Sequence, residues 1–174
     1  MFRRFAVVAA LGLLAIPAFS FGQFRQGDWE LTLGATGANS SDFDGFTAGG
    51  NASVGYFFTN ELELSVRQSI TYTDVATGAD GSVWNGSKRV ALDYHFDLGR
   101  WQPFVGANIG YVYGESTNDT WEAAPEVGVK YFVNATTFVY GIAEYQFFFD
   151  DGDDVDDAFD DGQFVYTVGI GFRF

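Results

Sequence analysis

The chain has 174 residues, a formal net charge of −14 and no cysteine, so disulfides, thiolate metal sites and a lipoprotein anchor are excluded. Aromatic residues make up 19% of the chain and glycine contributes 22 residues, which is unusual for a soluble domain, and the acidic charge argues against nucleic-acid binding. A mean hydropathy of +0.01 excludes a bundle of transmembrane helices, but not a barrel in which apolar and polar positions alternate.

The N-terminus has the pattern of a secretory signal peptide. Arg3 and Arg4 precede an apolar run at 5–16, which a proline and a zone of small residues follow. A retained anchor helix is the alternative, but the run is shorter than the roughly 20 residues that a spanning helix needs. We therefore predict a cleaved signal peptide over 1–22 and one mature domain over 23–174. Loss of the two arginines brings the mature chain to a formal charge of −16.

Beyond the signal, apolar residues recur at every second position instead of at helical spacing. Within 61–72, for example, leucine, valine, isoleucine and tyrosine alternate with glutamate, serine, arginine and threonine. Period two is typical of strands with one apolar and one polar face. In chain order we predict strands near 28–37, 47–58, 61–72, 83–96, 101–113, 121–133, 136–149 and 163–174. Strands of this length can cross a membrane at a tilt.

The connections between these strands alternate in length. Tight turns are expected at 59–60, 97–100 and 134–135. Longer stretches, rich in glycine and small polar residues, lie at 38–46, 73–82, 114–120 and 150–162. Short turns at one end and long loops at the other are typical of outer-membrane barrels, and this arrangement predicts that both chain ends lie on the periplasmic side.

The two faces of the strands distinguish a barrel from a soluble sandwich. A sandwich also alternates, but it buries its apolar face and exposes the polar one. Here the polar face is too charged to form a dry core, because buried charges are tolerated only when they are paired. That face carries Glu30, Glu63, Arg67, Arg89, Asp93, Glu122, Glu126, Lys130, Glu144 and Arg173. We predict an all-β fold, a closed eight-stranded antiparallel transmembrane β-barrel with up-and-down meander topology, because closure leaves no unpaired edge in the bilayer.

Aromatic residues gather near both ends of the predicted strands. On the turn side they are Trp29, Tyr56, Phe58, Tyr94, Phe96, Trp101, Tyr131 and Phe174. On the loop side they are Trp84, Tyr111, Tyr113, Trp121, Phe147 and Tyr166. Strands favour aromatic residues in any case, but placement at both ends is typical of the two membrane-interface girdles.

Two segments resemble a known family. The stretch WQPFVGANIGY at 101–111 and the ending YTVGIGFRF at 166–174 resemble strands of OmpA/OmpX-like small outer-membrane β-barrels. The resemblance implies a protein of the outer membrane that contacts lipid and lipopolysaccharide. It also implies that the barrel-assembly machinery reads the terminal Phe174. The chain ends at the barrel, so the resemblance does not imply peptidoglycan anchoring.

The ten charged residues of the polar face are the first candidate site. The interior of an eight-stranded barrel is just wide enough for side chains to fill it, so these acids and bases should meet across the lumen. One interpretation is a salt-bridged plug that blocks flow. The other is a gated ion path in which pairs exchange partners. The small bore favours the plug.

An acidic stretch near the C-terminus is the second candidate. Carboxylates at this density could hold a hard divalent cation such as Ca²⁺, although the spacing does not match an EF-hand. The alternatives are a solvated, self-repelling loop and a loop that shares the divalent ions of lipopolysaccharide. The residues are Asp150, Asp151, Asp153, Asp154, Asp156, Asp157, Asp160 and Asp161.

His95 is the single histidine of the chain. Barrels that deacylate lipid A carry a histidine and a serine two residues later on the same strand, and this chain has no serine at that position. We therefore expect His95 to pair with lumen carboxylates and not to act as a catalytic base. No cofactor motif is present. The predicted function is a non-catalytic structural or surface-interaction barrel; a narrow channel for ions or small solutes is the alternative, and a lipid-modifying envelope enzyme is a third.

Overall fold

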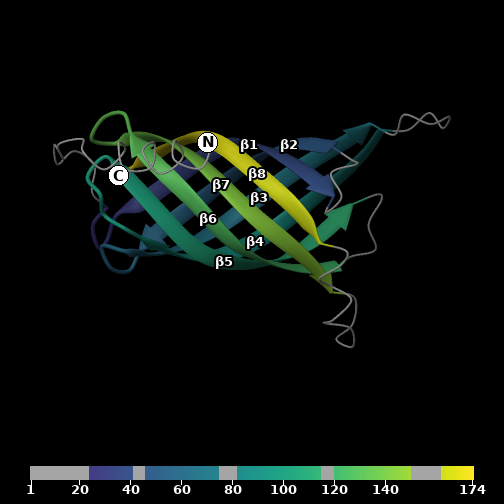
Figure 1. Ribbon diagram of the computed structural model, residues 1–174, viewed down its shortest axis with the longest axis horizontal. Helices are drawn as coiled ribbons and strands as arrows, with labels where there is room; N and C mark the ends of the chain where they lie inside the picture. Colours follow the sequence, from purple (N-terminus) through teal and green to yellow (C-terminus); the bar gives the residue numbers. More distant parts are fainter. Residues whose placement is uncertain (1–23, 41–45, 75–81, 115–119, 150–161) are drawn as a thin grey trace, which may run out of the picture.

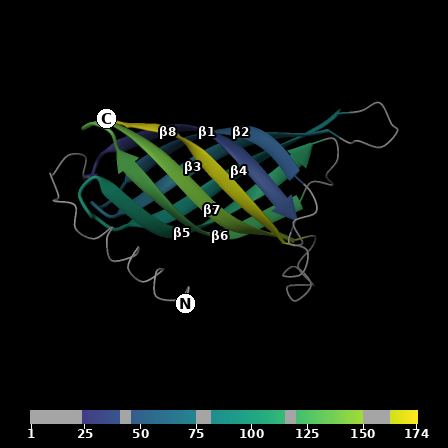
Figure 2. The same ribbon diagram turned by 45° about the horizontal axis from the view of Figure 1, so that its top comes forward.

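Eight strands run up and down along the chain, and each pairs with the next. They are β1 (Trp29–Ser40), β2 (Phe46–Phe57), β3 (Leu62–Asp74), β4 (Ser82–His95), β5 (Trp101–Gly114), β6 (Thr120–Phe132), β7 (Thr137–Phe149) and β8 (Gln163–Arg173). Strand β8 also pairs with β1, so the sheet closes into a barrel with no free edge (Figures 1 and 2). The predicted eight-stranded antiparallel barrel is confirmed.

The structure is a computed structural model, and it describes residues 24–40, 46–74, 82–114, 120–149 and 162–174. The predicted signal peptide and most of the longer connections lie outside the described residues. Within the described part, no helix is long and apolar enough to cross a membrane.

The strand boundaries differ from the predicted ones mainly where strands approach the longer connections. There β1 continues to Ser40, which pairs with Gln163, and β3 continues to Asp74, which pairs with Ser82. The polar residues at these positions are typical of a loop in the sequence, but their backbones still pair with those of the neighbouring strands. Backbone pairing therefore extends the ladder beyond the alternating pattern.

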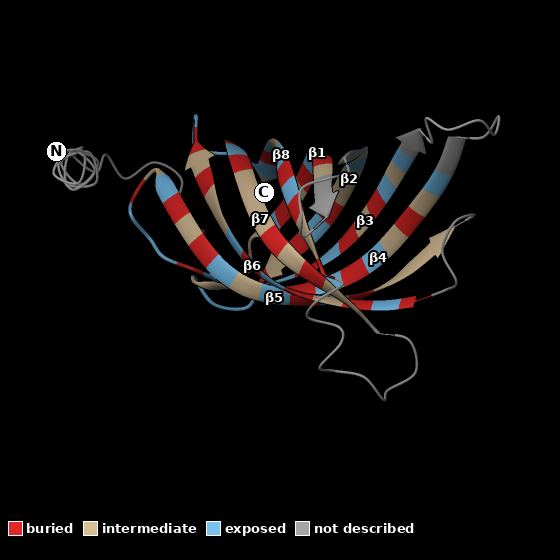
Figure 3. Ribbon diagram, turned by 45° about the vertical axis from the view of Figure 1, so that its right-hand side comes forward, coloured by how far each residue is buried: buried red, intermediate tan, exposed pale blue. Residues whose placement is uncertain are grey.

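The alternation of the sequence becomes the two faces of the barrel wall. Bands of buried and exposed residues follow one another along the strands in Figure 3. Outward positions hold large apolar side chains, with Val66 60% and Val168 63% exposed. Inward positions such as Glu63 and Glu126 are polar and buried. This inversion of a soluble core suits a barrel surrounded by lipid.

The two ends of the barrel differ in their connections. The end that we call the turn end carries the short connections 58–61, 96–100 and 133–136 and the C-terminal Phe174 (Figure 1). The opposite end is the loop end. Outward aromatic rings pair near both ends. At the turn end the pairs include Trp101–Tyr131 and at the loop end Tyr111–Trp121, with ring centroids 4.7 and 5.5 Å apart.

Candidate functional site in the barrel lumen

The lumen is closed at the turn end by aromatic rings. We call Phe24, Phe57, Phe104, Phe132 and Phe138 the turn-end aromatic cluster; all five are at most 3% exposed. Phe24 comes from the segment before β1 and stacks on Phe57, with centroids 4.0 Å apart and planes 11° from parallel. Its ring also meets the edges of Phe132 and Phe138. The segment is held across the barrel end because the Gly27 amide donates to the Phe57 carbonyl and the Gln26 amide to Asn60 Oδ1.

Lys130 lies directly on this cluster. Its ammonium is 5.0–5.6 Å from the ring centroids of Phe24, Phe57, Phe104 and Phe138, within the range of a cation–π contact. Lys130 Nζ also lies 2.6 Å from Glu30 Oε2 and 2.8 Å from Glu63 Oε2. Two carboxylates and four rings therefore enclose one buried ammonium.

Arg67 forms the next layer. Its guanidinium binds Glu126 in a bidentate arrangement, with Nη1 2.9 Å from Oε2 and Nη2 2.7 Å from Oε1. The same Nη2 lies 2.7 Å from Asp93 Oδ2, and Nε donates to Ser65 Oγ. Asn108 extends the layer by donating to both Glu126 and Glu144. The bidentate geometry suits the planar fork of arginine.

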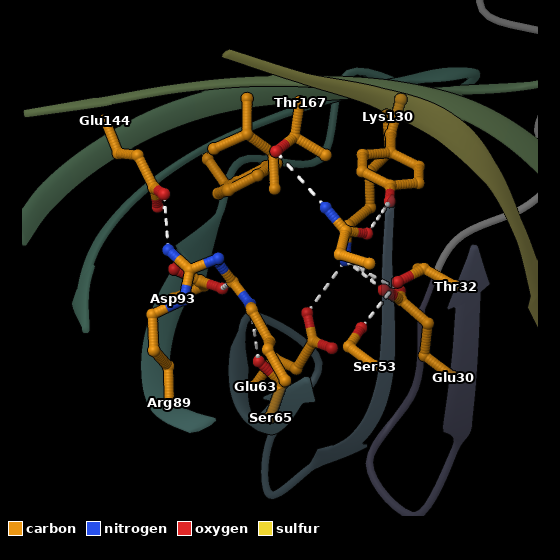
Figure 4. A pocket seen from close by; sticks show the side chains of 15 residues that line it. Glu30, Thr32, Ser53, Glu63, Ser65, Arg89, Asp93, Lys130, Glu144 and Thr167 are labelled. Atoms are coloured by element: carbon orange, nitrogen blue, oxygen red, sulfur yellow. Dashed lines mark hydrogen bonds and ion pairs between the residues drawn. The ribbon is translucent and has the colours of Figure 1, made fainter. Parts of the chain in front are cut away.

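Arg89 forms the third layer, nearest the loop end. It contacts Glu144 through Nη1, and its Nε lies 3.7 Å from Glu122 Oε1 (Figure 4 shows the Arg89–Glu144 contact). Between these layers a cavity of about 20 Å³ remains, which is room for about one water molecule. Beyond Arg89, toward the loop end, lies a larger cavity of about 190 Å³. Polar residues dominate its lining, among them Ser69, Glu122 and Gln163.

The comparison with known proteins agrees with this architecture. A family model described as outer membrane protein beta-barrel domain matches residues 6–174. The chain belongs to this family. As a member of the outer membrane protein beta-barrel family it is a protein of the outer membrane, and the predicted kinship with small OmpA/OmpX-like barrels is confirmed. No curated protein sequence matches it.

Solved structures show the same fold at low sequence identity. OprG from Pseudomonas aeruginosa is 14% identical with a TM-score of 0.63, over 88% of this chain and 99% of OprG. The N-terminal barrel of Pseudomonas aeruginosa OprF is 20% identical with a TM-score of 0.58, over 86% of this chain and 98% of that domain. Neisserial surface protein A is 14% identical with a TM-score of 0.59, over 84% of this chain and 94% of that one. Identities this low show the fold alone.

In this family member, the structure brings nine of the ten predicted lumen charges together. Each base lies between two acids, which gives six carboxylates and three bases in one connected interior. We call this set the lumen charge network: Glu30, Glu63, Arg67, Arg89, Asp93, Glu122, Glu126, Lys130 and Glu144. If every carboxylate is ionised, the network carries three negative charges in excess.

Arg173 does not share in these pairs. Its backbone pairs with that of Glu30, so both side chains start on the inner side of the wall. The Arg173 guanidinium, however, lies 3.5 Å from Asp28 Oδ2 and donates to the Ala135 carbonyl at the turn-end rim. The prediction that Arg173 belongs to the network is corrected, because the aromatic cluster occupies the inner side of the wall at this end.

His95 lies at the edge of the aromatic cluster. Its Nε2 is 3.5 Å from Glu63 Oε2, which brings it to a lumen carboxylate as expected, but too far for a well-formed hydrogen bond. Its main contacts are rings: the imidazole stacks on Phe104 at 5.0 Å and meets Phe57 at 5.1 Å. His95 therefore packs chiefly as a buried ring.

The turn-end aromatic cluster is the feature that sequence reasoning missed. We expected the inner face to be too charged for a dry core, yet five phenylalanines form one at the turn end. The alternation contained a signal, since Phe132 and Phe138 occupy the same face as Lys130 and Glu144. Neighbouring glycines make room, because a side chain at Gly128 or Gly171 would collide with the ring of Phe104 or Phe138.

The acidic stretch cannot be placed in this site, because Asp150, Asp151, Asp153, Asp154, Asp156, Asp157, Asp160 and Asp161 lie outside the described residues. Its Ca²⁺ site stays a prediction. In the part of the chain that the structure does describe, no three His, Cys, Asp or Glu side chains are arranged to hold a metal ion. The lumen carboxylates instead face the bases described above.

Proposed function

We propose that this barrel is closed to flow and serves the outer membrane as a structural or surface-interaction protein without catalysis. The observation that carries the proposal is the filled cross-section at the lumen charge network. The three bases and four of the six carboxylates line a cavity of only about 20 Å³ there, and Figure 4 shows several of these side chains around it. A hydrated ion needs a wider path than room for one water molecule.

The turn-end aromatic cluster supports the same proposal. A solute that passed Arg89 and Arg67 would next meet the Lys130 ammonium and the five buried rings beside it. The two layers oppose passage for different reasons. The aromatic layer solvates ions poorly, and the charged layer solvates apolar solutes poorly. The described lumen therefore favours a barrel that is closed to solutes over one that transports them.

If the lumen is closed, the interactions of the protein occur at its surfaces. The strongly acidic stretch at 150–161 is our candidate for contact outside the membrane, with Ca²⁺ or the divalent ions of lipopolysaccharide as its ligand. Isothermal titration of the folded protein with Ca²⁺ tests this directly. Heat of binding at millimolar or lower concentration is expected, and its absence removes the cation from the proposal.

A narrow channel is the second candidate, and two observations favour it. The cavity of about 190 Å³ at the loop end provides an entrance on one side. The excess of carboxylates over bases in the lumen charge network would select cations. Conduction would then require Arg67 or Arg89 to exchange one carboxylate partner for another.

Single-channel recording in planar bilayers separates the two candidates. We expect the wild-type protein to be silent. In Arg67→Ala, Asp93 and Glu126 lose their shared base, and we expect cation-selective leak if the variant stays folded. Arg25→Ala is the matched control, since Arg25 is exposed at the turn-end rim. Stable conductance steps in the wild type would contradict closure and make the channel the primary function.

A further inference from the structure

Among the described residues, the lipid-facing surface of the barrel has one polar interruption. Between the two aromatic girdles, the outward side chains that the structure describes are apolar or aromatic, apart from Gln68 on β3 and Lys88 on β4. The two residues are direct cross-strand neighbours in the β3–β4 ladder. A charge on the lipid face of a barrel is destabilising, most of all at the membrane centre, so its presence needs a reason.

Lys88 lies on the loop-end side of the membrane-facing band. It is four residues from Trp84 in the loop-end girdle and six from Tyr94 in the turn-end girdle. Its ammonium is 5.7 Å from the ring centroid of Tyr113, which belongs to the loop-end girdle. The long side chain can thus bring its charge toward the headgroups while its methylene groups stay in apolar surroundings.

Tyr113 is held in a defined position beside Lys88. Its ring lies over Gly86, where any side chain would come within 2.7 Å of the ring. Its hydroxyl accepts a hydrogen bond of 2.8 Å from Gln68 Nε2. Because the Tyr113 hydroxyl oxygen is the acceptor in this contact, the hydroxyl proton is still available for donation to another group. Gln68 is fixed in turn, since Nε2 also donates to the carbonyls of Ser69 and Ser87.

The Lys88 charge has no counterion in the described wall. The ion pairs among the described residues do not include it, and the carboxylates of the lumen charge network lie on the other side of the wall. The surface around it is apolar, with Val66, Val90 and Ile109 each at least 45% exposed. A matching ligand would therefore have an anionic head with several acceptor oxygens and an apolar tail.

We propose that Lys88 and Tyr113 bind the phosphate group of an anionic lipid in the leaflet at the loop end, and that Gln68 is the positioning residue for Tyr113. The Lys88 ammonium and the Tyr113 hydroxyl supply the donors, and charge-assisted hydrogen bonds to phosphate are strong. The acyl chains lie over the neighbouring valines and isoleucine. The site is distinct from the lumen and does not depend on whether the lumen conducts.

Native mass spectrometry of the folded full chain, released from micelles that contain phosphatidylglycerol or phosphatidylcholine, tests the site. We expect one phosphatidylglycerol to be retained in preference to phosphatidylcholine. Lys88→Met should reduce this retention about fivefold, the effect of one lysine at an anionic surface. Lys88→Arg should keep most of it, and Tyr113→Phe should lose part of it. Tyr94→Phe, at the opposite girdle, is the matched control and should change nothing.

Other outcomes overturn the proposal. Equal retention by wild type and Lys88→Met would show that the lysine binds no lipid. Displacement of the lipid by millimolar inorganic phosphate would identify free phosphate as the ligand. A change of oligomeric state in Lys88→Met, with lipid retention unaltered, would identify the patch as a protein interface. Folding should not obscure the result, because removal of a lipid-facing charge favours the folded barrel.

Discussion

The turn end and the loop end of the same lumen are built from different chemistry. At the turn end, aromatic rings exclude water and press against one enclosed ammonium. At the loop end, hydroxyl and amide side chains line a cavity of about 190 Å³. The ion pairs of the lumen charge network thus border apolar rings toward the turn end and a polar cavity toward the loop end.

This difference teaches how one barrel can tolerate so many interior charges. Lys130 and its carboxylates are far from the loop-end cavity and must satisfy each other almost completely. Arg89 and Glu122 both line that cavity, where water can replace a missing partner. Substitutions should therefore cost more at the turn end. Two experiments below test how dry the turn end is, and a third compares it with the loop end.

The largest effect is expected from Lys130→Met. The change leaves Glu30 and Glu63 buried without their base, and breaking a buried pair in this way costs about 3–5 kcal/mol. Denaturant titration of the protein in lipid vesicles measures the free energy of unfolding. The control removes all three charges together, Lys130→Met with Glu30→Gln and Glu63→Gln, and should recover most of the loss. A cost for Lys130→Met below about 1 kcal/mol, the value of exposed pairs, would contradict a dry turn end.

A smaller effect is expected from Phe24→Ala. Phe24 is 3% exposed and stacks on Phe57, so truncation opens a cavity in the turn-end aromatic cluster and should cost about 3 kcal/mol. Phe96→Ala is the control, because Phe96 is an outward girdle residue and 46% exposed. The same unfolding titration compares them. Equal costs would mean that the segment before β1 does not seal the lumen.

The smallest effect is expected at the loop end, from Gln163→Ala. Gln163 lines the loop-end cavity of about 190 Å³ and donates to Gln146 Oε1 at 2.8 Å, and water can take over this bond, so the cost should stay below about 1 kcal/mol. Gln102 is the matched glutamine at the turn end. It borders a cavity of about 310 Å³ at the rim, but it is only 2% exposed, and its Nε2 donates to Asp97 Oδ1 and to the Gly99 carbonyl. Gln102→Ala should cost about 1–3 kcal/mol. A larger loss of unfolding free energy for Gln163→Ala than for Gln102→Ala would contradict the difference between the two ends.

Much of the candidate site could be predicted from single positions. Glu63, Arg67 and Lys130 were assigned to the inner face because a strand turns successive side chains to opposite sides. The same rule places Phe132 inside and Lys88 outside, against the general preference of phenylalanine for lipid and of charge for the lumen. Phe24 gave no such signal, because it precedes the first alternating run.

The alternation of the sequence by itself determined the strands, the two faces of the wall and the closed all-β fold. These follow from local geometry, since the pleat repeats every two residues and the bilayer leaves no place for an unpaired edge. Only the tertiary structure decided which charges meet. Arg67 reaches Glu126 from 59 residues away and Lys130 reaches Glu30 from 100 residues away. Such partners depend on the register between strands and on the closure of β8 onto β1, which are properties of the whole barrel.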